Sequence, residues 1–256
     1  MLLVAFIAMS CLGSFPESRW KPAPSMPTTG LAAHRGAAES HPENTIAALE
    51  EAVRLGAAQI EFDVRGTADK KLVVLHDATV NRTTDGKGRV EEMSLAEIRA
   101  LDAGAWKDAA FTGESVPTLR EALAALPRDR WLNVNIKGKP WVAVASAQLL
   151  AEEERLGQSF LAVDEKGARA AVQAVPEVAF CLLERKSNRE SYIRASIRAG
   201  AQFIQLHKRR GTPSPEDIER LRDAGLRINH CCSDTVEKAQ KLQLLGVDFP
   251  LVDSFK

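Results

Sequence analysis

Two histidines stand at the ends of apolar segments, and each is followed directly by charge. His34 precedes Arg35 and Gly36, while His76 precedes Asp77. The unperturbed pKa of imidazole is about 6.5, so near neutral pH one histidine can accept a proton while the other donates one. A guanidinium can bind two oxygens of a phosphate group at once. These residues therefore indicate acid–base chemistry on a phosphate ester.

Two carboxylates, Glu61 and Asp63, lie between the histidines at the end of another apolar segment. On a strand, residues two apart point to the same side. Neighbouring carboxylates repel each other unless a cation or a base lies between them. Carboxylate oxygens favour hard divalent cations, so we expect Mg²⁺ or Ca²⁺, with Mn²⁺ as a third candidate. The alternative is a solvated surface strand, but the neighbouring Ile60, Phe62 and Val64 favour a place inside a sheet.

Composition suits one sizeable core and shows no sign of a nucleic-acid or anionic-membrane partner. The chain has 256 residues, 45% of them hydrophobic, and a single α/β barrel of about 250 residues is a familiar solution. The 34 basic and 34 acidic residues cancel, so no electrostatic footprint for nucleic acid or an anionic membrane is present. Nothing in the pattern indicates a particular oligomeric state.

The first 30 residues differ from the rest. Met1–Leu12 is almost wholly apolar, and four prolines follow between positions 16 and 27. The pattern predicts an export signal or a lipoprotein leader acylated at Cys11, then a proline-rich linker, with a catalytic domain over 31–256. We therefore expect an exported protein (periplasmic, secreted or lipid-anchored) that contacts membrane only through this leader. Because no Lys or Arg precedes Arg19, a misassigned start and a cytoplasmic protein stay open.

The cysteines do not suggest a disulfide framework. If Cys11 leaves with a leader, an odd number remains: Cys181, Cys231 and Cys232. Adjacent cysteines form a disulfide only in an unfavourable geometry, and the spacing typical of zinc sites is absent. We expect these side chains to be small buried hydrophobes.

From Leu31 onward, short apolar runs alternate with helical patterns. Runs that are apolar throughout, rather than alternating, are typical of parallel strands buried on both faces. With helices between them, they predict a (β/α)₈ TIM barrel, and a doubly wound open sheet is the competitor. The expected strands are Leu31–His34, Gln59–Val64, Leu72–His76, Trp131–Ile136, Phe160–Val163, Val178–Leu182, Phe203–Leu206 and Leu226–His230, with Pro250–Val252 as a ninth candidate.

One region interrupts the alternation of strand and helix patterns. The stretch from His76 to Trp131 is too long for a simple loop, so we expect an insertion after the third strand, over about residues 78–118. Thr118–Leu126 would then return to the helical layer. Insertions at the mouth of a barrel usually shape access to the substrate.

Barrel enzymes place their chemistry at the carboxyl ends of strands. Five candidates fall at or near such predicted ends: His34, Glu61, Asp63, His76 and Lys137. Three more lie near later strand ends, and for each both a pocket role and a structural role stay open: His207, His230 and Glu184.

The order and spacing of these motifs resemble the glycerophosphodiester phosphodiesterase family. The resemblance is close over residues 31 to about 137 and looser afterwards. The matching segments are His34-Arg35-Gly36, Pro42-Glu43-Asn44-Thr45, Ile60-Glu61-Phe62-Asp63-Val64, Leu72-Val73-Val74-Leu75-His76-Asp77, Asn81-Arg82-Thr83-Thr84-Asp85-Gly86-Lys87-Gly88, Val116-Pro117-Thr118-Leu119 and, near the end, Gly246-Val247-Asp248 and Asp253.

The resemblance implies a TIM barrel that uses a divalent cation to hydrolyse glycerophosphodiesters to glycerol 3-phosphate and an alcohol. By the same resemblance, His34 and His76 are the acid–base pair, and Glu61 and Asp63 are metal ligands. The substrate-binding residues it implies are Arg35, which would bind phosphate, Glu43, near the metal or Arg35, and Lys137.

The chain departs from the family where the fourth strand usually ends in Glu-x-Lys. Asn135-Ile136-Lys137 stands there instead. The resemblance makes Asn135 the third metal ligand, through a neutral oxygen. One anion fewer should weaken metal binding, because affinity follows ligand charge.

Three other functions remain open. A phospholipase D-like barrel acting on lysolipids or sphingomyelin would share the histidines and the carboxylate pair. A non-catalytic phosphodiester-binding protein would not need both histidines. A sugar-processing barrel would use the paired carboxylates but leave the histidines and Arg35 unexplained.

Overall fold

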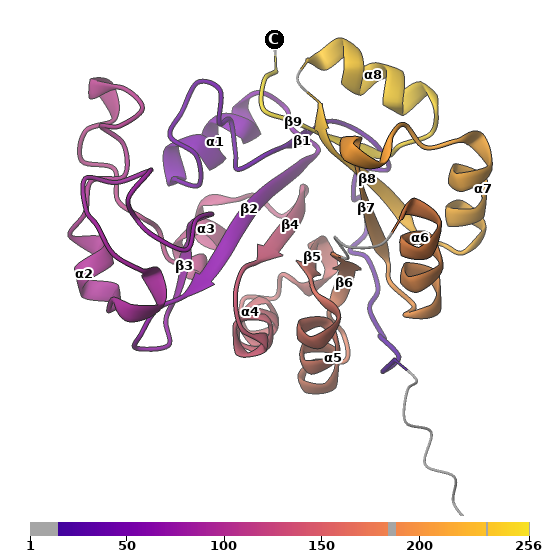
Figure 1. The fold of residues 1–256 in the computed structure, drawn as a ribbon, viewed down its shortest axis with the longest axis horizontal. Helices are drawn as coiled ribbons and strands as arrows, with labels where there is room; N and C mark the ends of the chain where they lie inside the picture. Colours follow the sequence, from indigo (N-terminus) through magenta and orange to yellow (C-terminus); the bar gives the residue numbers. More distant parts are fainter. Residues whose placement is uncertain (1–14, 184–187, 234, 256) are drawn as a thin grey trace, which may run out of the picture.

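The computed structural model describes residues 15–183, 188–233 and 235–255, and it confirms the TIM barrel (Figure 1). Eight parallel strands close into a ring, because the first strand pairs with both the second and the last. In ring order the strands are β1 (Ala32–Ala33), β2 (Gln59–Gly66), β4 (Trp131–Ile136), β5 (Ser159–Val163), β6 (Ala179–Leu182), β7 (Phe203–His207), β8 (Arg227–Ser233) and β9 (Phe249–Val252).

One predicted barrel strand is wrong. Leu72–His76 was expected to run parallel to its neighbours, but β3 (Leu72–Val74) pairs antiparallel with β2. A parallel crossover needs a dozen or more residues, and only the short turn at 67–71 separates these strands. The eighth place in the barrel belongs to β9, which was only a ninth candidate by pattern.

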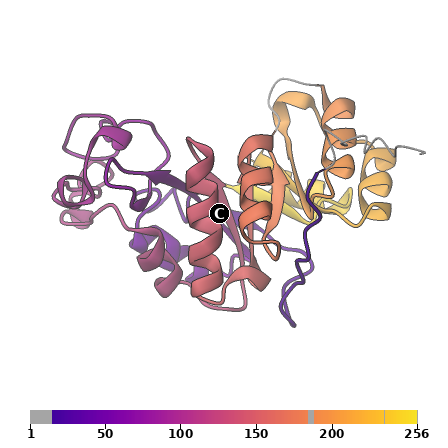
Figure 2. The ribbon, with the colours of Figure 1, turned by 90° about the horizontal axis from the view of Figure 1, so that it is seen from below.

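Helices cover the outside of the ring (Figures 1 and 2). Their starts follow capping chemistry: Thr45 accepts a hydrogen bond from the Ala48 amide, and Ser214 and Asp217 form a capping box at the start of the helix that begins with Pro215. No helix in the described ranges is long and apolar enough to cross a membrane. The helices are α1 (Ile46–Arg54), α2 (Leu95–Arg99), α3 (Leu119–Ala125), α4 (Pro140–Glu152), α5 (Glu165–Ala174), α6 (Arg189–Arg198), α7 (Pro215–Asp223) and α8 (Val236–Leu244).

The barrel interior changes from apolar to charged along its axis. Near the amino ends of the strands, the stacked rings of Phe160 and Phe203 lie 3.8 Å apart, and Trp131 packs edge-on against Phe203. One level higher, the Asn133 amide donates to Gln205 Oε1 at 3.0 Å. The carboxylates of β2 follow at the mouth. Because alternate residues face opposite ways, Ile60, Phe62 and Val64 instead join the core shared with the helices.

Residues 15–30, expected to be a linker, pack against the amino end of the barrel. Trp20 lies beside Trp131 and Phe203, with ring centroids 6.0 Å from each, and its indole nitrogen donates to Leu156 O. Phe15 stacks on Phe180. The folded unit therefore begins before residue 31. The rest of the predicted leader, residues 1–14, lies outside the described residues.

The predicted insertion forms an extension with a small core of its own, around α2 in Figure 1. It includes the short 3-10 turns η1 (Val90–Glu92) and η2 (Ala109–Phe111). The extension starts earlier than expected, because β3 supplies part of its core. That core is Val73, Leu75, Val80, Val90, Ile98, Ala103 and Val116.

Candidate active site

His34 lies directly after β1 and is held by the last strand of the barrel. Its amide donates to Val252 O at 3.0 Å, and its Nδ1 lies 2.6 Å from Asp253 Oδ1. Burial lowers the pKa of His34, but the hydrogen bond to Asp253 and the charges of Glu61 and Asp253 outweigh burial, so the net pKa is raised. His34 is therefore biased toward the protonated, donating form.

His76 follows β3 and has the opposite bias. Its Nδ1 lies 2.7 Å from Asp77 Oδ1, and Arg82 in turn holds Asp77. Burial lowers the pKa of His76, and the positive charges of Arg35 and Lys137 lower it further, more than Asp63 and Asp77 raise it. His76 is therefore biased toward the neutral, accepting form.

Glu61 is 1% exposed and accepts two hydrogen bonds. The Arg35 amide donates to its Oε2 at 2.9 Å, and the Asn135 amide nitrogen donates to its Oε1 at 3.1 Å. Burial and the neighbouring charge of Asp63 raise the pKa of Glu61. Positive charge placed near Glu61 would therefore be stabilising.

Asp63, also 1% exposed, lies among positive groups. Asn44 donates to its Oδ2 at 3.0 Å, Lys137 Nζ lies 3.1 Å from its Oδ1, and Arg35 Nε lies 3.6 Å from its Oδ2. Burial raises the pKa of Asp63, but Lys137, His76 and Arg35 outweigh burial and lower it. Asp63 therefore stays ionised.

The donor set here fits a hard divalent cation. Glu61 and Asp63 supply carboxylate oxygens, and Asn135 supplies an amide oxygen. Asn135 Oδ1 is buried and has no hydrogen-bond partner within the described part of the chain. Because buried acceptors are usually paired, this orphaned oxygen is consistent with a missing ligand. Glu61, Asp63 and Asn135 are thus the residues that could hold the metal.

Glu43 supports Arg35 from outside the cavity. Its Oε1 accepts from Arg35 Nη1 at 2.8 Å, and Arg82 donates to both of its oxygens. Arg82 also binds Asp77, so one network orients the phosphate-binding candidate Arg35 and the histidine partner Asp77.

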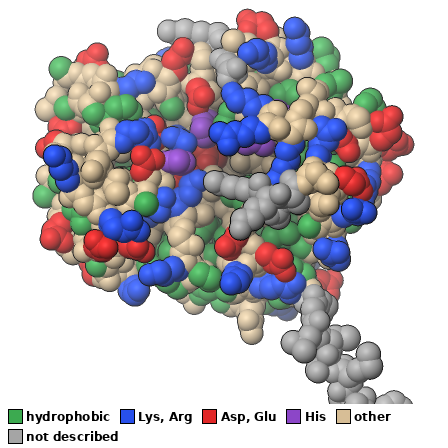
Figure 3. Space-filling model, viewed as in Figure 1, with side chains coloured by type: hydrophobic (Ala, Val, Ile, Leu, Met, Phe, Trp, Pro, Cys, Tyr) green, Lys and Arg blue, Asp and Glu red, His purple; other side chains and the backbone are tan. Residues whose placement is uncertain are grey.

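The candidates converge on one cavity of about 400 Å³. In Figure 3 histidine side chains gather in a hollow bordered by Lys and Arg. Every predicted site residue except Glu43 lines it, and so does His207, whereas His230 is buried and is not part of the lining. Glu184 lies outside the described residues. The lining is His34, Arg35, Glu61, Asp63, His76, Asn135, Lys137, Leu183, Tyr192, Gln205, His207, Arg209, Arg210, Cys231 and Cys232.

Sequence reasoning missed the residues that hold these groups. Asn44 and Arg82 lay within the family motifs but had no assigned role, and Asp253 stood only in the closing segment. Asp253 directly follows a predicted strand, and that position was the available signal.

The backbone around His34 is unusual for L-residues. Arg35 and Asn44 have positive φ, at 59° and 62°, in the left-handed region. Non-glycine residues adopt it rarely and often at functional sites. Gly36, with φ 78°, packs closely on α1: a Cβ there would lie 2.6 Å from the Ala48 carbonyl. The glycine allows close packing, and nothing assigns it to phosphate.

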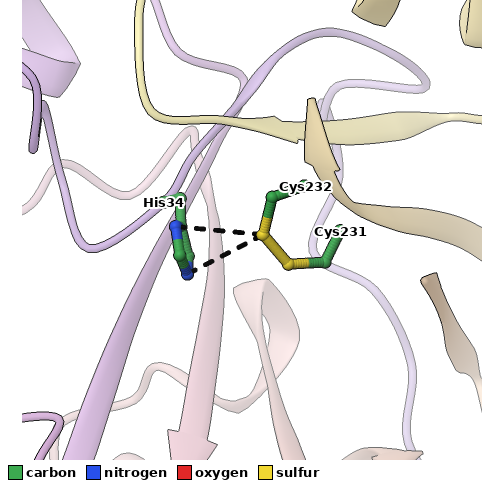
Figure 4. A group of neighbouring side chains, drawn as sticks. All are labelled: His34, Cys231 and Cys232. Atoms are coloured by element: carbon green, nitrogen blue, oxygen red, sulfur yellow. Dashed lines mark hydrogen bonds between the residues drawn. A yellow bond between two sulfur atoms is a disulfide. The ribbon is translucent and has the colours of Figure 1, made fainter. Parts of the chain in front are cut away.

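The prediction for two of the cysteines is wrong. Cys231 and Cys232, at the end of β8, form a disulfide in the cavity wall (Figure 4). Adjacency argued against this bond, but both cysteines lie in an irregular part of β8, where the register against β9 shifts between His230 and Ser233. Cys181 is free and buried, as expected.

Comparisons with known proteins identify the family of this chain. Residues 34–192 match the model of the glycerophosphoryl diester phosphodiesterase family. The Bacillus subtilis protein YhdW is 33% identical over 235 residues, which cover 87% of this chain and 93% of YhdW.

Solved structures show the same fold. The crystal structure of a glycerophosphodiester phosphodiesterase from Agrobacterium tumefaciens superposes with a TM-score of 0.78 at 31% identity, covering 89% of this chain and 97% of that one. An Oleispira antarctica phosphodiesterase, in complex with the product sn-glycerol-3-phosphate, superposes with a TM-score of 0.76 at 24% identity, covering 88% and 92%. The family-model match and the similarity to YhdW show that the chain belongs to the glycerophosphoryl diester phosphodiesterase family.

Proposed function

We propose that this enzyme hydrolyses glycerophosphodiesters to glycerol 3-phosphate and an alcohol, and that it needs a divalent cation. The observation that carries the proposal is the convergence of His34, His76, Glu61 and Asp63, with Arg35, on one cavity. The Oleispira structure, which holds sn-glycerol-3-phosphate, supports the choice of product.

The charge of the diester explains the basic and metal-binding groups. Glu61, Asp63 and Asn135 would hold the cation, which when bound neutralises phosphate charge and stabilises more of it in the transition state. Arg35 would bind a phosphate oxygen, because Glu43, itself bound by Arg82, holds its guanidinium at the cavity wall. Lys137 would bind phosphate or glycerol hydroxyls from its place beside Asp63.

The two histidines divide the proton transfers. In direct hydrolysis, neutral His76 accepts a proton from the water that attacks phosphorus, as the new P–O bond forms. Protonated His34 donates to the departing alcohol oxygen, as the old P–O bond breaks. Asp253 and Asp77 occupy the Nδ1 atoms, so each ring offers Nε2 to the substrate. The opposite pKa biases of the two rings favour this assignment over its reverse.

A metal-by-substrate matrix tests the proposal. The purified chain is stripped with EDTA, and Mg²⁺, Mn²⁺ or Ca²⁺ is returned with either glycerophosphocholine or lysophosphatidylcholine. We expect glycerol 3-phosphate from glycerophosphocholine, and only with metal. Preferential cleavage of the lysolipid would instead support a phospholipase D-like enzyme. Tight binding of glycerophosphocholine without turnover in any metal would support a binding protein.

A further inference from the structure

A second set of metal-binding groups lies in the wall of the same cavity. His34, Cys231 and Cys232 each offer one ligand atom, and these atoms lie within 4.8 Å of one another (Figure 4). Cys232 Sγ lies 3.9 Å from His34 Nδ1 and 4.0 Å from His34 Nε2. This trio differs from the carboxylate site because its ligands are soft sulfur and imidazole nitrogen, which favour Zn²⁺ over Mg²⁺ or Ca²⁺.

We propose that reduction of the Cys231–Cys232 disulfide opens a zinc-type site formed by His34, Cys231 and Cys232, and that an ion bound there removes His34 from catalysis. The metal site stands on the geometry alone. Its inhibitory consequence rests on the proposed function of His34.

The disulfide and the two reduced thiols differ in how well their sulfur atoms bind a metal ion. Thiolates are good ligands for Zn²⁺, whereas sulfurs bonded to each other carry no thiolate charge. A phosphine reductant and one water convert the disulfide to two thiols, and the phosphine becomes its oxide. Zn²⁺ then displaces the two thiol protons. The resulting set of one nitrogen and two sulfurs, with a fourth position open, is a known tetrahedral zinc arrangement.

The distance between His34 and Cys232 is close to that arrangement. Around a tetrahedral zinc, with Zn–S of about 2.3 Å and Zn–N of about 2.0–2.1 Å, nitrogen and sulfur stand roughly 3.5 Å apart. His34 Nε2 is already 4.0 Å from Cys232 Sγ, so a shift of about half an ångström brings them together.

Asp253 provides the carboxylate partner that a metal-binding histidine usually has on its second ring nitrogen. Its Oδ1 lies 2.6 Å from His34 Nδ1, leaving Nε2 for the metal. A carboxylate on the far nitrogen fixes the ring and raises its basicity as a ligand, and losing such a partner typically weakens metal affinity 10–100-fold.

The redox state of the Cys231–Cys232 pair would then determine whether Zn²⁺ can inhibit the enzyme. Disulfides persist in oxidising compartments and are rare in reducing ones. If the chain is exported, as the apolar Met1–Leu12 segment predicts, its disulfide closes outside and His34 is available. A reduced chain exposed to Zn²⁺ would be inactive.

Cobalt binding tests the site without reference to activity. The full chain is reduced with phosphine, freed of reductant under argon, held in excess Mg²⁺ to occupy the carboxylates, and titrated with Co²⁺. We expect one Co²⁺ per reduced chain with a thiolate-to-cobalt charge-transfer band, displaced by Zn²⁺. The oxidised chain should show no band, since carboxylate ligands cannot produce it.

Cysteine variants identify the ligands. Cys231→Ser/Cys232→Ser should lose the band. The matched control, Cys181→Ser, should keep it, because Cys181 is fully buried, does not line the cavity, and has a pKa raised to about 12. Asp253→Asn should weaken Co²⁺ binding by about 10–100-fold.

Activity gives the second readout, with each protein compared with itself before and after Zn²⁺. The reduced chain should lose roughly 10²-fold in turnover on zinc addition, the contribution expected of a general acid, while the oxidised chain should not respond. No band in the reduced chain, or a band that survives in the double-serine variant, would overturn the site. If the double-serine variant does not fold, the oxidised and reduced wild-type spectra decide alone. A chain without diesterase activity contradicts only the proposed function.

Discussion

We expect Asn135 to determine how much metal the carboxylate site needs, and replacing it by aspartate tests this directly. The substitution Asn135→Asp keeps the shape of the side chain but puts a carboxylate oxygen where an amide nitrogen now donates to Glu61 Oε1 at 3.1 Å. At that separation and an effective dielectric constant of about 20, two unit charges repel by about 5 kcal/mol.

Protonation limits this penalty. Protonating one carboxyl with an ordinary pKa of about 3.9 at pH 7 costs about 4 kcal/mol. This cost is lower than the repulsion of about 5 kcal/mol, so one of the two carboxylates takes up a proton. We expect Asn135→Asp to be less stable than wild type by about 4 kcal/mol at pH 7 without metal. The folded pKa is raised, so the penalty grows with pH above the unfolded pKa and shrinks to about 1.5 kcal/mol at pH 5.

Metal should offset most of the loss. Both carboxylates would then face the cation, and Mg²⁺ at 100 times its dissociation constant stabilises the fold by about 2.7 kcal/mol. Urea denaturation with EDTA or with excess Mg²⁺, at pH 5 and pH 7, measures each quantity. In the activity assay, the variant should reach half-maximal rate at lower Mg²⁺ than wild type.

Two controls separate charge from packing. Asn133→Asp places the same change in the same strand at a buried residue that does not line the cavity, so Mg²⁺ should not restore its stability. Asn135→Ala removes the hydrogen bond without adding charge, at about 1–3 kcal/mol independent of pH. If the loss in Asn135→Asp does not vary with pH, or if Mg²⁺ leaves it unchanged, Asn135 does not lie beside a cation site.

Three further outcomes are expected. His34→Ala and His76→Ala should each lower turnover roughly 10²-fold with unchanged circular dichroism. The control His41→Ala, at a residue outside the cavity lining, should keep its turnover. Near-normal turnover in either of the first two variants would contradict the acid–base assignment. Asp253→Asn removes the hydrogen bond and charge that raise the pKa of His34, so the alkaline limb of the pH–rate profile should move to lower pH; an unmoved limb would show that His34 is not the acid. His230 is 4% exposed, and burial lowers its pKa to about 4. Between pH 6.5 and pH 4 this histidine is therefore protonated in the unfolded chain but neutral in the folded one. As the pH falls through that range, the free energy of unfolding should decrease by about 3 kcal/mol. Denaturation midpoints across that range should show this slope in wild type and not in His230→Leu.

The chemistry of the site was readable from local sequence because each group lies beside a strand end. Glu61 and Asp63 are two apart in β2, so the strand period alone predicts that they share a face. The alternation of apolar runs with helical patterns likewise predicted a barrel, with Thr118–Leu126 in its helical layer. These features depend on residues only a few positions apart, so they can be predicted from the local sequence.

What the sequence left undecided depended on segments distant in the chain. Pattern alone could not show that Leu72–Val74 turns back on β2, since apolar residues suit parallel and antiparallel strands alike. Barrel closure brings Asp253 to His34 across 219 residues, and Cys232 to the same ring across 198. These contacts set the protonation bias of His34 and form the candidate soft-metal site. They exist only because the first and last strands pair, and no periodicity in the sequence records that pairing.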